Sequence, residues 1–373
     1  MKLSLLQENF NLALNHVSRF VSVKAQLPIL NNILLSTDSG RLKLSATNLE
    51  LGINYWIGAK IEEEGSVTVP SHEISEFVSY LNSGKLDLSL NGNLLNIKSP
   101  KAESDFAITP AADFPTLNSI NPKDTFEINY SEVIDSINQI TFSAATDDSR
   151  PVLTGILCCF TPTIFTFVAT DGFRLSTKEI VLKTPVTLPG GKEKLTFLIP
   201  AKTLTEITKL AKTDSKIKIG ITTDEHQIVF VLDDLELVSS LLDGQYPEYQ
   251  KIIPENFSTK IFVNKDELTQ AIKLASVFAA QSANVVKMNI KSDSIEITAN
   301  APQLGKNKIT LDAKVEGEPL EIAFNFKFIL DFIGIAKGKE LSIKVNEPLT
   351  PGLFSDLSNP AYTHIIMPVR IQD

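Results

Sequence analysis

One arrangement of apolar and polar positions occurs three times along the chain. It starts with alternating apolar residues, reaches a polar residue, and continues with apolar residues spaced three and four apart. This switch of period predicts a short strand followed by an amphipathic helix. The three copies are residues 3–14, 126–137 and 261–272. Such repetition indicates a fold assembled from copies of one unit.

A second segment recurs at the same spacing. Residues 44–51 (Leu-Ser-Ala-Thr-Asn-Leu-Glu-Leu) resemble residues 167–175 (Phe-Val-Ala-Thr-Asp-Gly-Phe-Arg-Leu). Both the step from Leu3 to Phe126 and the step from Ala46 to Ala169 are 123 positions. Two matches at one offset favour a true internal repeat, and residues 297–300 give a looser third match.

Each copy also predicts a second helix and a following strand. The second helices are expected to start at residues 69–71, 199–201 and 324–326. Two of these starts contain Pro, which a first helical turn tolerates because its missing N–H would have no partner there. Alternating strands follow at residues 86–90, 217–221 and 341–345. Asn91-Gly92 after the first of them predicts a hairpin turn.

The repeats predict an α+β fold with three domains of about 120 residues each. Each domain is expected to hold two helices packed on sheets that are mostly antiparallel, because the connections are short. The predicted domains are residues 1–120, 124–253 and 254–373. Their linkers, near residues 121–124 and 253–256, carry Pro and polar residues.

The charge balance restricts the classes of function. The chain has 35 Lys and Arg against 44 Asp and Glu, a formal charge of -9. This argues against a protein that coats nucleic acid with a broad basic surface, but it allows a local basic stripe. No apolar run is long enough to span a membrane, and the apolar start of the chain is too short for a secretory signal. With the adjacent Cys158 and Cys159, these features predict a cytoplasmic protein.

Catalytic chemistry is not evident in the sequence. The four histidines (His16, His72, His226 and His364) fall at unrelated places in the repeat and lack ligand-like spacing, so we expect them to be exposed or satisfied. No glycine-rich phosphate loop is present. We therefore predict no catalytic residue, no metal and no cofactor.

Two reactive residue types have simpler explanations. Asp171-Gly172 is typical of a turn. Cys158 and Cys159 lie in an apolar segment that predicts a strand, where buried inert thiols are expected. An enzyme of an unrecognised class that uses a histidine or Asp171 stays as one alternative.

Basic residues fall on equivalent predicted helices. They are Lys202, Lys209 and Lys212 in the second copy and Lys265 and Lys273 in the third. If the repeats were arranged in a circle, these helices would face a common axis and could hold a polyanion without reading its sequence. The second helix of the first copy has no Lys or Arg, so Arg19 and Lys24 would have to supply charge there.

The order of several short motifs resembles a known family. Leu-Pro-Ile-Leu-Asn-Asn at residues 27–32 is followed by Ala-Asp-Phe-Pro at 112–115 and Ala-Thr-Asp-Gly-Phe-Arg-Leu at 169–175. Tyr-Pro-Glu-Tyr at 246–249 and Met-Pro-Val-Arg-Ile at 367–371 complete the set. Together they resemble the bacterial DNA polymerase III beta subunit, the replicative sliding clamp, over the whole chain.

This resemblance implies a non-catalytic processivity factor. It implies a head-to-tail homodimer whose six domains form a pseudo-sixfold ring around duplex DNA, independent of sequence. A clamp loader would open the ring, and the replicative polymerase, the loader and repair proteins would bind through a short linear peptide. The second alternative is a repeat-built interaction scaffold that does not encircle DNA.

The resemblance also implies roles for individual residues. The partner-peptide pocket would comprise Leu153, Thr170, Gly172, Phe173, Arg174, Leu175, Pro247, Lys251, Ile252, Leu349, Pro351, Ile365, Met367, Pro368, Val369 and Arg370. Phe106 and Ile108 would meet Val277 and Phe278 of a second copy, and the alternation of residues 105–109 around them fits an edge strand. Lys24 and Arg150 would lie near DNA. Phe173 and the tail Gln372-Asp373 depart from the usual family pattern and could alter the preferred peptide.

Overall fold

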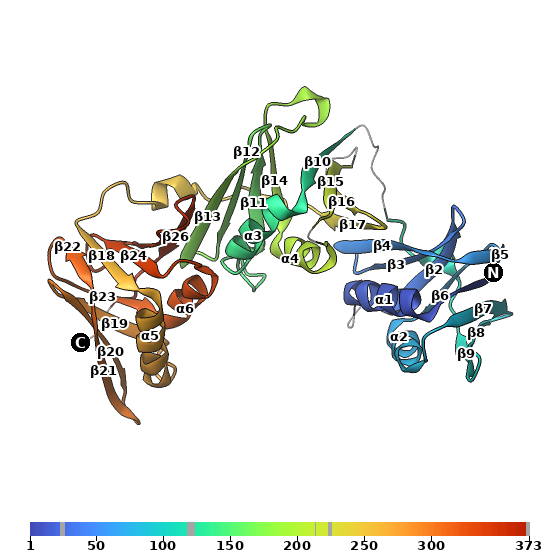
Figure 1. Cartoon of the computed structure of the whole chain (residues 1–373), viewed down its shortest axis with the longest axis horizontal. Helices are drawn as coiled ribbons and strands as arrows, with labels where there is room; N and C mark the ends of the chain where they lie inside the picture. The colour runs from blue at the N-terminus through green and yellow to red at the C-terminus, as the bar shows by residue number, and fades with distance from the viewer. Residues whose placement is uncertain (23–26, 118–123, 213, 223–225, 371–373) are drawn as a thin grey trace. The chain divides into compact units, whose positions relative to one another are not determined.

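The computed structural model describes residues 1–22, 27–117, 124–212, 214–222 and 226–370 (Figure 1). The chain divides into two compact units, each described here by itself. The first unit comprises residues 1–131, 186–192 and 206–241, and the second comprises residues 132–185, 193–205 and 242–373. The three predicted domain boundaries stay a prediction.

The first unit contains two antiparallel sheets within its described residues. One has the strand order β5-β1-β7-β8-β9, and the other has the order β10-β15-β16-β17-β4-β3-β2-β6. The strands are β1 (Lys2–Leu6), β2 (Asn32–Asp38), β3 (Arg41–Thr47), β4 (Leu51–Gly58), β5 (Lys60–Glu63), β6 (Ser66–Pro70), β7 (Lys85–Asn91), β8 (Leu94–Lys98), β9 (Glu103–Ala107), β10 (Thr125–Asn129), β15 (Lys216–Ile221), β16 (Gln227–Leu232) and β17 (Leu235–Ser240).

Two helices pack together in the first unit, α1 (Gln7–Val17) and α2 (Ser71–Tyr80). Phe10, Leu14 and Val17 form the fully buried stripe of α1, which explains the three-and-four spacing of the sequence. The predicted hairpin is confirmed: β7 and β8 pair, and Gly92 between them has a φ of +59°. A positive φ favours Gly at this turn.

The second unit also contains two antiparallel sheets within its described residues. Their strand orders are β14-β11-β12-β13-β26-β25-β24-β18-β22 and β21-β20-β19-β23. The strands are β11 (Gly155–Phe160), β12 (Ile164–Thr170), β13 (Arg174–Val181), β14 (Leu195–Pro200), β18 (Thr259–Asn264), β19 (Val285–Ile290), β20 (Ser294–Ala301), β21 (Gly305–Asp312), β22 (Lys314–Glu316), β23 (Leu320–Asn325), β24 (Glu340–Val345), β25 (Gly352–Asp356) and β26 (Tyr362–Ile366).

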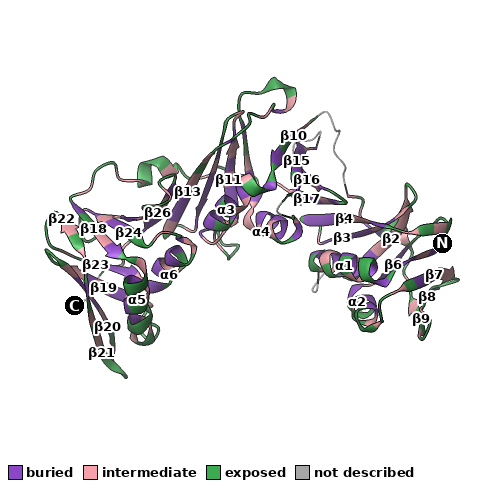
Figure 2. Ribbon diagram, in the orientation of Figure 1, coloured by how far each residue is buried: buried purple, intermediate pink, exposed green. Residues whose placement is uncertain are grey.

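Helices α5 (Lys265–Ala279) and α6 (Phe326–Ile335) lie side by side in the second unit, and α5 packs on the four-stranded sheet (Figure 1). Asn264 caps α5, because its side chain accepts hydrogen bonds from the N–H groups of Asp266 (2.8 Å) and Glu267 (3.2 Å). Figure 2 shows α5 with one buried side and one exposed side. Helices α3 (Tyr130–Thr141) and α4 (Ala201–Leu210) have residues in both units.

The predicted α+β class, the two helices per copy and the antiparallel pairing are confirmed for the described residues. The sheets, however, extend past the sequence repeats. Strand β17 pairs with β4 of the first repeat, and β13 pairs with β26 of the third. The central repeat therefore contributes strands to both compact units. Among the described residues, no helix is long and apolar enough to cross a membrane.

Candidate functional site

The turn between β12 and β13 shapes one edge of the predicted peptide pocket. Its Asp171 Oδ1 accepts hydrogen bonds from the N–H groups of Phe173 (2.9 Å) and Arg174 (3.0 Å). Gly172 has a φ of +89°, and a Cβ there would lie 2.6 Å from the Arg150 guanidinium. Asp171 is thus a turn-forming residue, as the sequence predicts.

Arg174 is held on several sides within the second unit. Its Nε donates to Asp171 Oδ2 (3.1 Å), its Nη2 donates to the Phe142 carbonyl (2.7 Å), and its Nη1 pairs with Asp331. The guanidinium also lies over the ring of Phe328, 4.6 Å from the centroid. Its side chain is only 11% exposed. These contacts attach α6 and the segment after α3 to the turn, so most donors of Arg174 already have protein partners.

An apolar cluster lies beside this turn. Its buried members are Val168, Leu175, Leu353 and Ile365. Five partly buried side chains pack against them, namely Leu157, Tyr246, Tyr249, Ile253 and Phe257. The cluster thus unites two predicted pocket residues, Leu175 and Ile365, because they are direct partners in the β13–β26 pairing. The remaining members were not singled out by the sequence, although the Tyr-Pro-Glu-Tyr motif contains two of them.

Several predicted pocket residues are unusually exposed for apolar side chains. Phe173 is 60% exposed, Leu349 61%, Ile252 37% and Met367 36%. The Met367 N–H donates to the Phe173 carbonyl (2.8 Å), which brings these two residues together. Leu153 is buried in contrast. Exposed apolar side chains next to a buried apolar cluster are typical of a binding surface.

The other predicted pocket residues lie in segments near this cluster in sequence. Pro247 precedes Tyr249, Lys251 pairs with Glu248, and Pro351 precedes β25. The stretch Pro368, Val369 and Arg370 follows Met367, and the Val369 N–H donates to the Ala323 carbonyl (2.8 Å). The pocket assignment stays a prediction.

A buried polar network lies under the β13–β26 pair. Ser176 Oγ is 2.8 Å from His364 Nδ1, 2.7 Å from Ser143 Oγ and 3.0 Å from Tyr362 Oη. His364 is fully buried, and its Nε2 has no hydrogen-bond partner among the described residues. The expectation of exposed or satisfied histidines is therefore wrong for His364. Burial, together with the Arg174 charge, lowers the pKa of His364 to about 3.

The Ser176–His364 contact is not a catalytic site. Both side chains are completely buried, and the ring of Phe332 stacks on His364 with centroids 5.5 Å apart. A nucleophile must reach its substrate, and this pair is covered by core side chains. The network instead aligns β13 with β26 across the two repeats.

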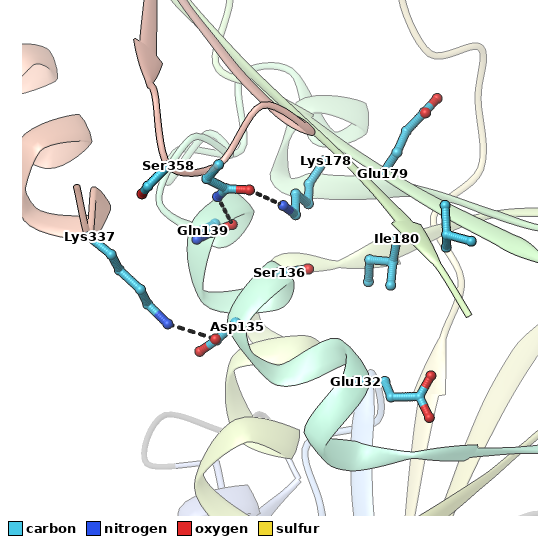
Figure 3. A pocket seen from close by; sticks show the side chains of 11 residues that line it. Glu132, Asp135, Ser136, Gln139, Lys178, Glu179, Ile180, Lys337 and Ser358 are labelled. Atoms are coloured by element: carbon cyan, nitrogen blue, oxygen red, sulfur yellow. Dashed lines mark hydrogen bonds and ion pairs between the residues drawn. The ribbon is translucent and has the colours of Figure 1, made fainter. Parts of the chain in front are cut away.

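A polar cavity of about 390 Å³ lies on the same sheet beyond this network (Figure 3). Lys337 Nζ lies 2.6 Å from Asp135 Oδ2, while Lys178 donates to Asn359, which in turn donates to Gln139 Oε1 (3.2 Å). Burial lowers the pKa of Lys178. These bonds connect α3 to loops of the third repeat, so these polar side chains of the lining already have partners.

The predicted DNA-facing residues have varied surroundings. Lys202, Lys212 and Lys273 are exposed. Lys209 pairs with Glu206 (2.9 Å), which also pairs with Arg19 (2.7 Å).

Three further residues complete this set. Lys265 donates to the Ala336 carbonyl at the end of α6, and Arg150 Nη2 donates to the Asp171 carbonyl (2.7 Å). Lys24 lies outside the described residues. The DNA-facing set stays a prediction.

The residues predicted for the subunit contact lie at an edge strand and on α5, and the contact itself stays a prediction. Phe106 and Ile108 lie on and just after β9, which is the last strand of its sheet. The Phe106 ring packs edge-on against Phe77, with centroids 5.3 Å apart. On α5, Val277 is 62% exposed and Leu274, one turn earlier, is 49% exposed. Phe278 is partly buried. The sequence missed Leu274, which the i, i+3 spacing could have revealed.

Metal and thiol chemistry find no support in the described part of the chain. Among those residues, no group of three or more His, Cys, Asp or Glu side chains could hold a metal ion. Cys158 is completely buried, and burial raises the pKa of its thiol well above the usual value. A buried thiol of this kind is unreactive. Cys159 is only partly buried, so the expectation of a buried thiol is wrong for that residue.

Two helices per repeat, packed on antiparallel sheets that continue from one repeat into the next, define a repeat-built α+β protein. Family models of the DNA polymerase III beta subunit match residues 1–118 (N-terminal domain), 127–248 (central domain) and 250–370 (C-terminal domain). The chain belongs to the DNA polymerase III beta subunit family.

Individual relatives agree with this assignment. The chain is 28% identical to the beta sliding clamp of Synechococcus elongatus over 378 residues, covering 100% of both chains. It is 29% identical to that of Bacillus subtilis over 383 residues, covering 99% of this chain and 100% of the relative. The crystal structure of the B. subtilis DNA polymerase sliding clamp superposes with a TM-score of 0.93 at 29% identity, covering 100% of both chains. The beta subunit structure from Thermotoga maritima gives a TM-score of 0.91 at 27% identity, again with 100% coverage of both.

Proposed function

We propose that this chain is a DNA sliding clamp. Two copies would form a ring around duplex DNA and tether the replicative polymerase and other proteins that carry a short linear peptide. The observation that carries this proposal is the match of all three beta-subunit domains, in order, along the chain. The chain would act in the cytoplasm without a catalytic step or a cofactor of its own.

Ring closure is supported by two free sheet edges. Strand β9 ends one sheet of the first unit, and β21 ends the four-stranded sheet of the second unit, next to α5. An edge strand offers unpaired N–H and C=O groups to another chain. Head-to-tail contacts between such different surfaces close into a ring when the rotation fits, and here two copies would suffice.

DNA would be held by charge and not by base contacts. The chain has a formal charge of -9, yet Lys202, Lys212 and Lys273 are exposed on or just after helices. Together with Lys24 and the other predicted basic residues, they would contact phosphates. Phosphate contacts carry no sequence information, so a loaded ring could slide.

The partner peptide would dock on the apolar cluster of Leu175 and Ile365 and the exposed side chains of Phe173 and Met367. A largely preformed apolar pocket suits this role, because it can anchor a few apolar side chains of the peptide. Tethering raises the effective concentration of the polymerase at the primer end, which increases processivity.

Retention on circular DNA tests the proposed function. The chain is loaded onto a nicked circular plasmid by the clamp loader of the same organism in the presence of ATP. The DNA-bound fraction is then isolated by gel filtration. A ring should stay on the circle and leave after a restriction enzyme linearises it, because sliding allows escape only at free ends. Failure to be retained on the circle, or retention that survives linearisation, would support an interaction scaffold instead.

The double substitution Leu175→Ala with Met367→Ala tests the peptide pocket. It removes one buried and one exposed apolar contact, so we expect binding of the replicative polymerase of the same organism to fall at least about tenfold, consistent with the loss of two apolar anchors. Calorimetry measures the affinity, and sedimentation checks that assembly is unchanged. Val181→Ala, at a residue 74% exposed outside the pocket, is the control. Unchanged polymerase affinity would refute the pocket assignment.

A further inference from the structure

A second candidate binding surface lies in the third repeat. It is a groove of about 880 Å³ on the four-stranded sheet β21-β20-β19-β23. Val286, Met288, Ile295 and Ile297 of this sheet are buried on the side covered by α5. The groove lies on the opposite face, where the alternate residues of these strands project.

Cross-strand pairing builds the floor of the groove. Lys287 is directly opposite both Ala323 and Thr298, and Thr298 is opposite Lys308. These residues therefore form one row across four strands on the same face. Val369 extends the row, because its N–H donates to the Ala323 carbonyl (2.8 Å). The short side chain of Thr298 lies between Lys308 and Lys287, and that of Ala323 lies between Lys287 and Val369, so the row alternates long and short side chains.

The charge of the groove is one-sided. Its lining includes four cationic residues, Lys287, Lys306, Lys308 and Arg370, and no carboxylate. At the rim, Lys287 pairs with Glu321 (3.0 Å) and Lys308 pairs with Glu296 (2.7 Å).

The other two cations have no carboxylate partner in the part of the chain that the structure describes. Lys306 and Arg370 form no ion pair with any described residue. The groove thus concentrates uncompensated positive charge on a chain whose formal charge is -9. Complementary charge across an interface gives specificity and speeds encounter, so the occupant should be an anion.

We propose that this groove binds a carboxylate-rich peptide segment of a partner protein. Val369 and Arg370 belong both to the groove and to the predicted peptide pocket, so a partner peptide could continue from one into the other. That continuity rests on the proposed function, whereas binding of an acidic segment in the groove does not depend on it.

The lining favours a peptide over a nucleic acid strand. Proteins that bind single strands combine cations with aromatic side chains on which bases stack. This groove has no aromatic residue in its lining, and its apolar members are aliphatic, including Val285, Ala323 and Val369. Aliphatic walls beside ammonium groups suit an extended chain that carries Asp or Glu side chains.

The test uses the full chain and a fluorescein-labelled octaglutamate peptide at low salt, with octaglutamine as the neutral probe. Fluorescence anisotropy should show binding of octaglutamate only, weakening as salt screens the charges. Lys306→Gln with Lys308→Gln should reduce the affinity about fivefold or more, as expected for two exposed ion pairs. The control Lys101→Gln with Lys339→Gln removes the same charge from exposed positions outside the groove and should leave binding unchanged.

Each outcome decides the proposal. Equal loss in the groove and control variants would mean that only net charge matters, and absent octaglutamate binding would refute the site. Tighter, Lys306-dependent binding of an octathymidine strand would assign the groove to nucleic acid instead. An unchanged sedimentation coefficient and melting temperature would confirm that the variants fold. If the double variant does not fold, Lys306→Gln alone serves as the milder test.

Two comparisons separate this proposal from the proposed function. The variant Leu175→Ala with Met367→Ala should keep octaglutamate binding, because neither residue lines the groove. A chain that binds octaglutamate in the groove but is not retained on circular DNA would leave the groove standing and refute the clamp. Retention on DNA without octaglutamate binding would support the clamp and refute the groove.

Discussion

At the scale of single residues, buried polar side chains form contacts between segments that are far apart in the sequence. Arg174 was predicted to belong to the partner-peptide pocket, yet its guanidinium already contacts Asp171, Asp331 and the Phe142 carbonyl. Asp331 lies 157 positions away in sequence. No local pattern identifies such a partner, because the contact exists only once β13 and α6 have been brought together.

The buried His364 should make the stability of the second unit sensitive to acid. Burial and the Arg174 charge lower its pKa from 6.5 to about 3, so the folded chain keeps the imidazole neutral. The unfolded chain binds a proton below pH 6.5, so acidification between pH 6.5 and 3 favours unfolding. From pH 7 to pH 5, His364 should cost about 2 kcal/mol of stability.

Urea unfolding of the full chain as a function of pH checks this prediction. His364→Gln retains a side chain able to bond Ser176 but does not titrate, so its profile should be flatter between pH 7 and pH 5. His72→Gln, at an exposed histidine, should reproduce the profile of the parent chain. Parallel profiles for the parent chain and His364→Gln would rule out His364 as the origin of the acid sensitivity.

At the scale of elements, the proposed assembly depends on the edges of the sheets. The sequence predicted that residues 105–109 form an edge strand, and β9 is the terminal strand of its sheet. It also predicted α5, whose last turn carries the exposed Val277. Alternation and helical period are local properties, which is why both elements were found without the fold. Whether another chain covers them depends on two surfaces far apart in sequence.

The substitution Val277→Asp tests the predicted contact between subunits and should leave the fold of the single chain intact. Val277 is 62% exposed, so an aspartate there is solvated in the single chain but would be buried and unpaired in the dimer. The dissociation constant should rise at least about thirtyfold, since an unpaired interfacial charge costs several kcal/mol. Sedimentation measures the shift toward the 41.0 kDa chain.

A second variant and a control accompany this test. Phe106→Asp should act in the same direction, although it also removes the packing of Phe106 on Phe77. Val181→Asp places the same charge at a residue 74% exposed elsewhere and should leave assembly unchanged. If Val277→Asp assembles like the Val181→Asp control, α5 is not part of the contact.

At the scale of the whole molecule, the sequence repeats and the compact units differ. The repeats predict three domains, whereas contacts divide the chain into two units because β17 joins β4 and β13 joins β26. The neighbouring repeats therefore complete each other's sheets.

Small-angle scattering with mass from the forward intensity tests the ring directly. We expect a particle of twice the 41.0 kDa chain mass with the distance distribution of a hollow ring. The hollow follows from the proposed closure of six similar domains around DNA. A compact particle of one chain mass at every concentration tested would contradict a stable ring, and Val277→Asp should reproduce that monomer.

The sequence alone determined the helices, the strands that precede and follow them, the hairpin at Gly92 and the threefold repetition, because periodicity and turn chemistry are set by neighbouring residues. Its motif order also identified the family. Only the tertiary structure decided that Leu175 and Ile365 share a cluster with Leu353 and that His364 is buried. It alone revealed the basic groove, whose members come from four strands, the turn before β19 and the segment after β26. Such sites depend on strand order and register, and these are fixed by packing between segments that the linear sequence keeps apart.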